Sequence, residues 1–191
     1  AGAKIIAEPG EIDAAAGDYG FRFFDPDGRA MEVITGGKPR AARKLAKGEA
    51  IPVGISHVVL HSPNHKGLAE FFQQALGFRL SDWIGDCMVF RCCNSAHHRL
   101  AILPGPPALN HIAFDVASVD ELMRGLARMH ESGIKLSWGP GRHTAGDNTF
   151  CYFISPNGNA VEYTSDLEHV DEASWVPTTY EPGPNTIDQW G

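Results

Sequence analysis

Two short motifs recur along the 191-residue chain, each at a constant spacing. Pro26–Glu32 aligns with Pro156–Glu162, 130 residues later, and four of the seven positions are identical. Ser56–Leu60 aligns with Asn110–Phe114, 54 residues later, and each is a short apolar run with histidine in second place. Repetition at a fixed spacing predicts a fold built from copies of one supersecondary unit. No other feature of the sequence constrains the architecture as strongly.

A helix and three short strands are predicted after each copy of the histidine motif. The first helix spans about residues 66–76, with an apolar stripe, and stops at Gly77. The second begins at the capping box of Ser118 and Glu121 and ends by Gly133. The strands are expected near residues 79–83, 88–92 and 98–103, and again near 135–138, 150–154 and 159–164. The unit is therefore βαβββ, present twice, which predicts an α+β fold with both units in one cupped, mostly antiparallel sheet.

Composition and pattern divide the chain into four parts: residues 1–35, 36–50, 51–166 and 167–191. The first part ends in the same hairpin motif as the complete units, so we expect it to be the end of an earlier copy. The second, rich in Gly, Lys and Arg, is a predicted linker. The third holds the two complete units, 51–105 and 107–166. The Pro-rich tail shows no periodicity and is expected to lie extended on the surface, held by its aromatic side chains. Because the chain begins without Met inside an apparent unit, we expect a fragment.

The charge balance excludes several classes of function. With 16 Lys and Arg against 23 Asp and Glu, the net charge of −7 argues against a nucleic-acid or anionic-membrane surface. No apolar run approaches the ~20 residues that span a bilayer, and the first residues lack the apolar core of a signal peptide. We therefore expect a cytoplasmic protein. The four cysteines include no C-x-x-C pair, which favours reduced thiols over a zinc site or disulfides.

One carboxylate near the end of the second unit needs a partner. Residues 150–154 and 160–164 are predicted strands, and the turn residues Ser155 to Gly158 join them into a hairpin. Strand alternation puts Glu162 on the face of Ala160 and Thr164, among small and apolar neighbours. A buried carboxylate costs several kcal/mol unless it is paired or bound to a metal. The sequence therefore indicates that something neutralises Glu162.

Two histidines at matching positions of the repeat, His57 and His111, are the natural partners of Glu162. A single histidine on a strand is more often structural, but a matched pair is hard to explain by packing. Two His and one Glu are ligand types that hold a catalytic divalent metal. Symmetry predicts a fourth ligand on the last strand of the first unit, yet residues 98–103 contain no carboxylate. Two His and one carboxylate with open positions are typical of non-haem Fe(II) oxygenases.

Residues 51–166 resemble the catalytic domain of a type I extradiol ring-cleavage dioxygenase of the vicinal oxygen chelate (glyoxalase) superfamily, in the group of the 2,3-dihydroxybiphenyl and catechol 2,3-dioxygenases. The matching signature consists of Gly141-Arg142-His143, Tyr152, Pro156-Asn157-Gly158 and Glu162. Two positions depart from the family pattern: Cys151 is smaller than the usual apolar residue, and Ser155 precedes Pro156. We expect these departures to affect the shape of the pocket and not the chemistry. The resemblance also implies that residues 1–35 end a metal-free N-terminal domain.

The resemblance implies a role for each site residue. His57, His111 and Glu162 would hold Fe(II), and Mn(II) could use the same ligands. His98, thirteen residues before His111, would be the acid–base histidine. The remaining expected site residues are His143 and Tyr152, which would hydrogen-bond the substrate, and Asp147 and Asn148, whose loop position predicts that they line the pocket.

The implied reaction is extradiol cleavage of a catechol with O₂ to a muconic semialdehyde-type product, in the degradation of aromatic compounds, by a homo-oligomer. A glyoxalase-like isomerase or thiol transferase is one alternative, but it needs a fourth Glu or Gln ligand near residues 98–103. A metal-free binding module of the same fold is the other, and it leaves the triad without a purpose. Without the triad, His97 and His98 would be a solvated pair. Four further histidines are expected at the surface: His61, His65, His130 and His169.

Overall fold

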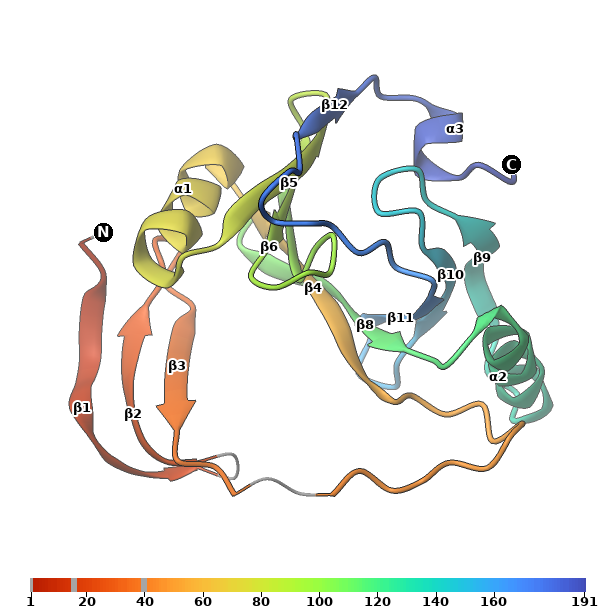
Figure 1. Ribbon diagram of the computed structural model, residues 1–191, viewed down its shortest axis with the longest axis horizontal. Helices are drawn as coiled ribbons and strands as arrows, with labels where there is room; N and C mark the ends of the chain where they lie inside the picture. Colours follow the sequence, from red (N-terminus) through yellow and green to blue (C-terminus); the bar gives the residue numbers. More distant parts are fainter. Residues whose placement is uncertain (1, 15–16, 39–40) are drawn as a thin grey trace.

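A computed structural model describes residues 2–14, 17–38 and 41–191, and the strands in these residues form two sheets (Figure 1). The smaller sheet has three antiparallel strands, β1 (Lys4–Ala14), β2 (Gly17–Phe24) and β3 (Ala30–Thr35). The larger sheet has nine strands in the order β12-β5-β6-β7-β4-β8-β11-β10-β9. These strands are β4 (Gly54–Ser62), β5 (Arg79–Ile84), β6 (Met88–Cys92), β7 (Leu100–Pro104), β8 (Ala108–Asp115), β9 (Leu136–Arg142), β10 (Thr149–Ile154), β11 (Ala160–Ser165) and β12 (Thr178–Tyr180).

The nine-stranded sheet has an internal twofold pattern. On the two sides of the antiparallel pair β4 and β8, the order continues β7, β6, β5 and β11, β10, β9. The first strand of each unit pairs in parallel with the last, β4 with β7 and β8 with β11, while the other pairs within each unit are antiparallel. The predicted α+β fold of paired βαβββ modules in a cupped, mostly antiparallel sheet is confirmed.

The hairpin repeat holds at the level of strand register. Phe24 pairs with Ala30 at the end of β2 and β3, and Ile154 pairs with Ala160 at the end of β10 and β11, so both pairs are shifted by the same 130 residues. The turn glycines Gly28 and Gly158 have φ values of 85° and 86°, a left-handed conformation that a side chain at either position would disfavour. The short sequence echo therefore encodes one hairpin geometry used twice.

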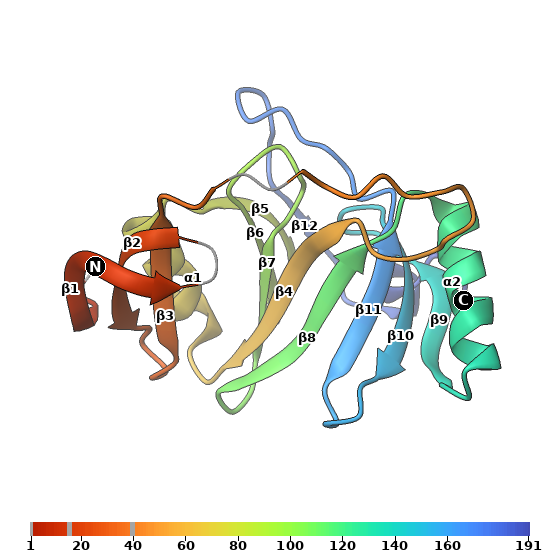
Figure 2. The same cartoon turned by 90° about the horizontal axis from the view of Figure 1, so that it is seen from below.

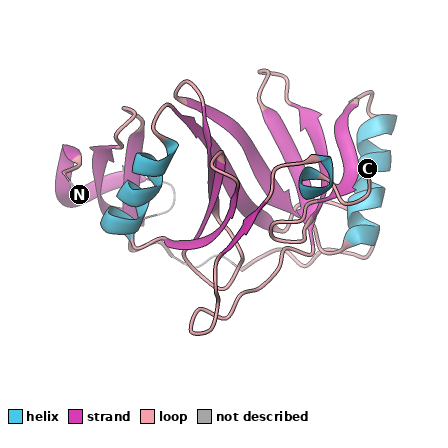
Figure 3. Ribbon diagram, turned by 90° about the horizontal axis from the view of Figure 1, so that it is seen from above, coloured by secondary structure: helices cyan, strands magenta, loops and turns pink. Residues whose placement is uncertain are grey.

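The two long helices lie at opposite ends of the nine-stranded sheet (Figure 3). Helix α1 (His65–Leu76) begins at Asn64, whose side chain accepts from the backbone of Gly67, and ends at Gly77 in the left-handed conformation. Helix α2 (Val119–Glu131) begins at the predicted cap Ser118. No helix of the described residues is long and apolar enough to cross a membrane.

Two strands differ from the sequence-based expectation by more than one residue at an end. Strand β7 begins at Leu100 and not at residue 98, because His97 donates its backbone N–H to Glu168 in the tail and holds the preceding residues in a loop. Strand β9 runs from Leu136 to Arg142 and is longer than the predicted 135–138. Its extension passes through Gly139 and Pro140, residue types that are depleted in strands.

The largest core cluster joins the small sheet to α1 and the large sheet. Phe23 of β2 packs with Phe71 of α1 at a ring-centroid distance of 6.1 Å. The buried members of this cluster are Phe23, Leu60, Leu68, Ala69, Phe71, Phe72, Val89, Leu100 and Ile102. A second cluster under α2 contains Leu122, Cys151, Phe153 and Tyr163. Each helix thus covers the sheet of its own unit, and α1 also carries the three-stranded sheet.

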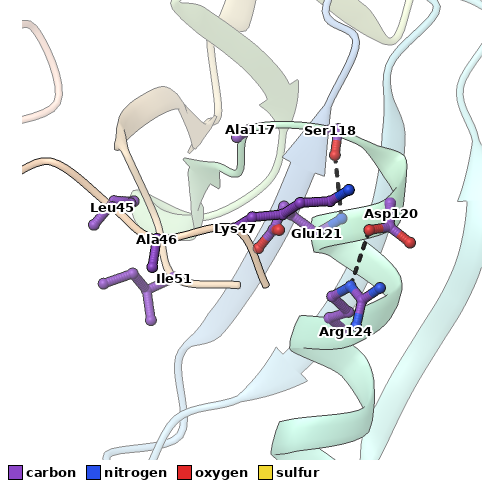
Figure 4. Close-up of a pocket in the computed structure, with 9 residues that line it drawn as sticks. All are labelled: Leu45, Ala46, Lys47, Ile51, Ala117, Ser118, Asp120, Glu121 and Arg124. Carbon is purple, nitrogen blue, oxygen red and sulfur yellow. Dashed lines mark hydrogen bonds and ion pairs between the residues drawn. The ribbon is translucent and has the colours of Figure 1, made fainter. Parts of the chain in front are cut away.

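The segment that leads into β4 lies against the start of α2, across the molecule from the small sheet (Figures 1 and 2). Its anchor is the carboxylate of Glu121, which accepts from the backbone of Gly48 and of Ala50, both at 2.6 Å. Figure 4 shows Glu121 beside this segment and Ser118, whose hydroxyl accepts from the Glu121 backbone. Only half of the predicted capping box is therefore present, because the Glu121 side chain holds the incoming chain and does not return to Ser118.

The C-terminal tail is more ordered than the sequence predicts. Strand β12 adds to the edge of the large sheet by pairing in parallel with β5, and a short helix α3 (Pro184–Ile187) follows. Trp175 is half-buried and donates its indole N–H to the backbone of Ser81 at 2.8 Å, whereas Trp190 is 56% exposed. The expected aromatic packing is seen at Trp175, and backbone pairing holds the tail in addition.

We predict that Phe23→Ala lowers the free energy of unfolding by about 3–5 kcal/mol, the usual cost of removing a buried aromatic side chain. Phe23 is 2% exposed and is shared by both sheets through α1. Urea denaturation followed by circular dichroism measures the change. The matched control is Phe24→Ala, one residue along β2 and only half-buried, which should cost clearly less. Equal losses for the two variants would show that the small sheet is not packed on α1.

Candidate metal centre

Three side chains from neighbouring strands converge at the centre of the large sheet. His57 of β4, His111 of β8 and Glu162 of β11 offer ligand atoms that all lie within 4.8 Å of one another. The Oε2 atom of Glu162 is 3.2 Å from Nε2 of His57 and 3.1 Å from Nε2 of His111. All three are buried, with exposed fractions of 3%, 6% and 0% for His57, His111 and Glu162. The structure thus brings together the three residues that the repeat singled out.

The strand register explains this convergence. Ala113 of β8 pairs with His57 on one side and with Glu162 on the other, so these two side chains flank it. His111 lies two residues earlier on β8 and therefore points to the same face of the sheet. The site needs no loop to form, because regular pairing across three strands brings its ligands together.

The same register identifies the position of a symmetric fourth ligand. In the second unit, Glu162 pairs with the residue two places after His111. In the first unit, the residue two places after His57 is Val59, and it pairs with Ala101 of β7. Ala101 is fully buried and carries no ligand atom. The position that corresponds by pseudo-symmetry to Glu162 thus carries a methyl group. The first unit therefore supplies one ligand, His57, and the second unit supplies two.

Buried ligand atoms that lack a hydrogen-bond partner indicate that the triad fits a divalent metal. Among the described residues, Nε2 of His111 and Oε2 of Glu162 are buried atoms without a hydrogen-bond partner. Such atoms are rare and costly in proteins unless something else satisfies them. Because they lie 3.1 Å apart and face the same space as Nε2 of His57, a single cation between them would satisfy all three.

Neighbouring polar side chains hold the three ligands in orientation. Nδ1 of His111 lies 2.6 Å from the side-chain oxygen of Asn110, an acceptor, so Nδ1 carries the proton and Nε2 keeps its lone pair. Nδ1 of His57 lies 3.2 Å from the hydroxyl of Ser56. The amide of Asn148 donates to Oε1 of Glu162 at 3.2 Å, which leaves Oε2 for the centre.

Charge balance at the site favours an ionised carboxylate. Burial acts to raise the pKa of Glu162, but the imidazoles of His57 and His111 outweigh it and hold this pKa well below the ordinary value. A carboxylate that stays ionised without solvent is a strong ligand for a hard or borderline cation. The site is therefore prepared for a positive charge.

His98 lies in the loop before β7 and is buried, with an exposed fraction of 3%. Its ring contacts His57 at a centroid distance of 4.3 Å and Phe90 at 5.0 Å, and Nδ1 lies 2.9 Å from Nδ1 of His97. Burial, followed by the neighbouring His57 and His97, lowers the pKa of His98 well below its ordinary value. The alternative of a solvated histidine pair is wrong, because neither His97 nor His98 reaches solvent.

His143, in the loop after β9, and Tyr152 of β10 lie beside the triad. Nε2 of His143 lies 3.3 Å from the Tyr152 hydroxyl, and Nδ1 lies 2.6 Å from the backbone carbonyl of Ile187, to which it donates. The Tyr152 ring meets His111 edge-on at 5.1 Å. Burial, reinforced by Glu162, raises the pKa of Tyr152 well above its ordinary value, so the phenol keeps its proton.

The five aromatic and imidazole groups of the site line one cavity of about 350 Å³. Its residues are His57, Val59, Ile84, Met88, Phe90, His98, Leu103, Asn110, His111, Ser137, Trp138, His143, Ala145, Tyr152, Ala160, Thr186 and Ile187. Among these described lining residues none is Asp, Glu, Lys or Arg. The lining thus combines apolar side chains with imidazole, hydroxyl and amide groups, which is typical of small-molecule sites.

Two expectations about residues near the cavity need correction. Asp147 is not among the lining residues, because its carboxylate turns outward to Arg142 at 3.0 Å and to the side chain of Gln189 at 3.2 Å. Cys151 faces the core under α2, where burial, followed by Glu162, raises the pKa of its thiol to about 12. Its departure from the family pattern therefore affects core packing and not pocket shape.

Sequence reasoning missed several residues that support the site. Asn110 orients His111, and its amide nitrogen lies 2.8 Å from Nε2 of His61, which is half-buried and not a surface residue. Asn148 touches the ligand Glu162 and does not line the cavity. Ile187, in the tail, holds His143. The position of Asn110 beside a predicted ligand was an available signal, but no sequence pattern links residue 187 to the site.

Comparison with known proteins shows what this chain is similar to. Residues 54–163 match the model of the Glyoxalase/Bleomycin resistance protein/Dioxygenase superfamily. The chain is 32% identical to Metapyrocatechase 2 of Cupriavidus necator, with all of this chain and 65% of the relative aligned. It is 31% identical to Biphenyl-2,3-diol 1,2-dioxygenase of Paraburkholderia xenovorans, over 83% of this chain and 58% of the relative. The chain thus spans less than two thirds of the length of these relatives.

A solved structure agrees with these sequence matches in fold. The crystal structure of the Mn(II)-bound glyoxalase from Novosphingobium aromaticivorans superposes with a TM-score of 0.91 and is 54% identical in sequence. The superposition covers 100% of this chain and 63% of that one. A divalent metal in a similar fold agrees with the metal centre inferred from the unsatisfied ligand atoms.

We predict that Glu162→Gln abolishes retention of a divalent metal, because a neutral amide replaces the buried anionic ligand while the shape is kept. The protein is loaded with Mn²⁺, desalted, and its metal content is measured by mass spectrometry. The wild-type protein should keep about one ion per chain. The control is His130→Gln on α2, an exposed histidine outside the site, which should behave like the wild type. A Glu162→Gln protein that keeps a full equivalent would contradict the assignment of this ligand.

Proposed function

The chain belongs to the Glyoxalase/Bleomycin resistance protein/Dioxygenase superfamily, and we propose that it cleaves the ring of a catechol-type diol with O₂, beside the two hydroxyls, using Fe(II) or Mn(II). Both named relatives at 31–32% identity support cleavage of aromatic diols. The Mn(II) bound to the glyoxalase of similar fold supports a divalent ion at this position. The metal identity and the diol are part of the proposal.

The observation that carries the proposal is the three-ligand centre with Ala101 at the symmetric fourth position. A divalent iron or manganese ion, if held by these two imidazoles and one carboxylate, would supply a Lewis acid for the diol and O₂. A carboxylate at position 101 would add a fourth protein ligand. The methyl group of Ala101 offers no ligand atom.

Three side chains of the cavity have the chemistry to act on a bound diol. Nδ1 of His98 is occupied by His97, so Nε2 is the nitrogen that can exchange a proton with the substrate. His143 can orient a substrate oxygen through Nε2 because its Nδ1 is bound to Ile187. Tyr152, protonated at neutral pH, donates a hydrogen bond. Together these groups would hold the diol in one orientation and move its proton.

The residues that line the cavity indicate which substituent the catechol ring carries. Besides its polar residues, the described lining includes several apolar side chains, among them Ile84, Phe90, Leu103 and Ile187. Burial of an unpaired carboxylate against such a wall is strongly unfavourable. Burial of an apolar group gains roughly 25 cal/mol per Å². We therefore assign as substrate a catechol that carries an apolar substituent and no carboxylate.

A glyoxalase-like isomerase is the second candidate, because the similar solved structure carries that name. The four-ligand centre of such an enzyme would need a Glu or Gln at position 101, where this chain has a buried Ala. A metal-free binding module would leave Nε2 of His111 and Oε2 of Glu162 buried without a hydrogen-bond partner. The diol cleavage proposal is the one that uses every feature of the site.

We predict that the Fe(II)-loaded protein consumes O₂ with an alkyl- or aryl-substituted catechol and forms a yellow semialdehyde. The colour arises because cleavage beside the hydroxyls leaves a conjugated aldehyde and enol. An oxygen electrode and a visible absorbance scan measure the reaction. A catechol with a carboxylate of similar size is the matched comparison, and its kcat/KM should be at least about 10-fold lower, as expected for one unpaired buried charge.

A colourless dicarboxylic acid in place of the yellow product would contradict cleavage beside the hydroxyls. Equal kcat/KM values for the two catechols would contradict the substituent assignment alone. Conversion of a thiol-linked hemithioacetal without O₂ uptake would establish the isomerase instead. The three outcomes can be distinguished because the first is read from the product, the second from the comparison of substituents and the third from the uptake of O₂.

We predict that His98→Asn keeps the metal and the affinity for the diol but lowers kcat by about 10²–10⁴, the usual contribution of general acid–base catalysis. The amide fills much of the imidazole volume but cannot exchange a proton near neutral pH. Stopped-flow spectra of diol binding and steady-state kinetics separate binding from turnover. An unchanged kcat would make His98 a packing residue.

A further inference from the structure

His98 has two ring nitrogens, and its use in the proposed function depends on which of them carries a proton when the site is at rest. Nothing on the cavity side of the ring selects this, because the described contacts of His98 there are ring faces, those of His57 and Phe90. The protonated nitrogen of His98 must therefore be selected by contacts on the side of the ring away from the cavity. There a second buried histidine and a buried aspartate, which the mechanism above does not use, form a chain of hydrogen bonds.

The chain of hydrogen bonds runs from Asp82 through His97 to His98. Oδ2 of Asp82 lies 2.8 Å from Nε2 of His97, and Nδ1 of His97 lies 2.9 Å from Nδ1 of His98. An ionised carboxylate only accepts, so Nε2 of His97 carries the proton. A neutral His97 then presents a lone pair at Nδ1, and His98 must donate from its own Nδ1. Nε2 of His98 is left with a lone pair toward the cavity.

We propose, resting on the function proposed above, that Asp82 and His97 are positioning residues that fix the tautomer and ring orientation of His98. Both are fully buried, with exposed fractions of 0%. Packing does not account for them, because apolar residues of similar volume would fill the same space without the cost of burying a carboxylate and an imidazole. On the side of the cavity, the pair ends at the Nδ1 atom of His98.

The C-terminal tail holds this pair in place. The backbone N–H of Thr178 donates to Oδ1 of Asp82 at 2.6 Å, which satisfies the oxygen that His97 does not use. The Trp175 ring meets His97 edge-on at 5.7 Å, and its N–H binds the backbone of Ser81, next to Asp82. The Ser81 hydroxyl in turn donates to the backbone carbonyl of His97. Strand β12 is therefore a part of the positioning machinery.

Gly146 packs against the hydrogen bond between His97 and His98. A Cβ atom at this position would lie 3.0 Å from Nδ1 of His97 and 3.1 Å from Nδ1 of His98, and the glycine has a φ of 89°. The backbone of the loop after His143 therefore covers the hydrogen bond between the two imidazoles. A covered hydrogen bond does not exchange partners with water, so it can hold one tautomer.

The test compares three variants in the full chain loaded with Zn²⁺, a diamagnetic probe, and with Fe²⁺ for kinetics. His97→Phe keeps the ring volume but removes both nitrogens. His97→Asn can return an acceptor oxygen at the place of Nδ1. His169→Asn is the control, an exposed histidine in the tail whose ring bonds only to Ser95 among the described residues.

Nitrogen-15 NMR of histidine side chains should show His98 of the wild type protonated at Nδ1, with the signal assigned by its loss in His98→Asn. In His97→Phe this pattern should change, and kcat should fall by about 10–100-fold, the usual effect of removing an orienting partner. The KM for the diol and the metal content should stay close to wild type, whereas the thermal midpoint should fall because the buried Asp82 carboxylate loses its partner. His97→Asn should recover most of the turnover, and His169→Asn should match the wild type throughout.

A wild-type His98 protonated at Nε2 would overturn the proposal without any variant, so it stays testable if His97→Phe fails to fold. An unchanged kcat and an unchanged His98 signal in His97→Phe would also overturn it. The NMR arm needs no substrate. If catechols are not cleaved, the function proposed above fails while the Nδ1–H tautomer of His98 can still be observed.

Discussion

Glu162 is a carboxylate shut away from water, and the arrangement of the centre follows from how it is satisfied. One oxygen receives the amide of Asn148, and the other faces the Nε2 atoms of His57 and His111. This requires β11 to lie beside β8, and β8 beside β4, in one register. A shift of one residue in the β11–β8 pairing would turn Glu162 to the opposite face of the sheet, and the same shift in the β8–β4 pairing would turn His57 away from the centre. The order of the central strands and the chemistry of the centre thus depend on the same requirement, that the buried Glu162 carboxylate be satisfied.

The imidazoles around the cavity share one arrangement. Nδ1 of His57, His111, His98 and His143 is engaged, in that order, by Ser56, Asn110, His97 and the backbone of Ile187. Nε2 of each is turned to the metal centre or the cavity, and that of His143 lies 3.3 Å from the Tyr152 hydroxyl. The engaging groups come from regular strands, from the loop before β7 and from the tail. A regular strand pairing therefore gathers the ligands, while irregular segments decide how the flanking histidines are turned.

This division explains which parts could be predicted from the sequence. His57, His111 and Glu162 follow from a repeat and from strand alternation, which are local patterns. Asn110 was visible beside a predicted ligand, but its role depends on a rotamer. The pairing of Asp82 with His97, and of Thr178 with Asp82, joins residues whose contact depends on tertiary structure. Asp147 was placed wrongly because a left-handed residue, with φ of 52°, turns its side chain away from the cavity.

The tail has a further consequence for the order in which the molecule matures. Residues 168–190 leave the ribosome after both βαβββ units, so the three strands that carry the ligands emerge before β12 and α3. The groups that hold Asp82 and His143, in β12 and around α3, arrive later. Scaffold and reactivity are therefore completed at different times during synthesis. A nascent chain that already holds its ligands in place still lacks a fully oriented set of proton-handling side chains until translation has passed the tail.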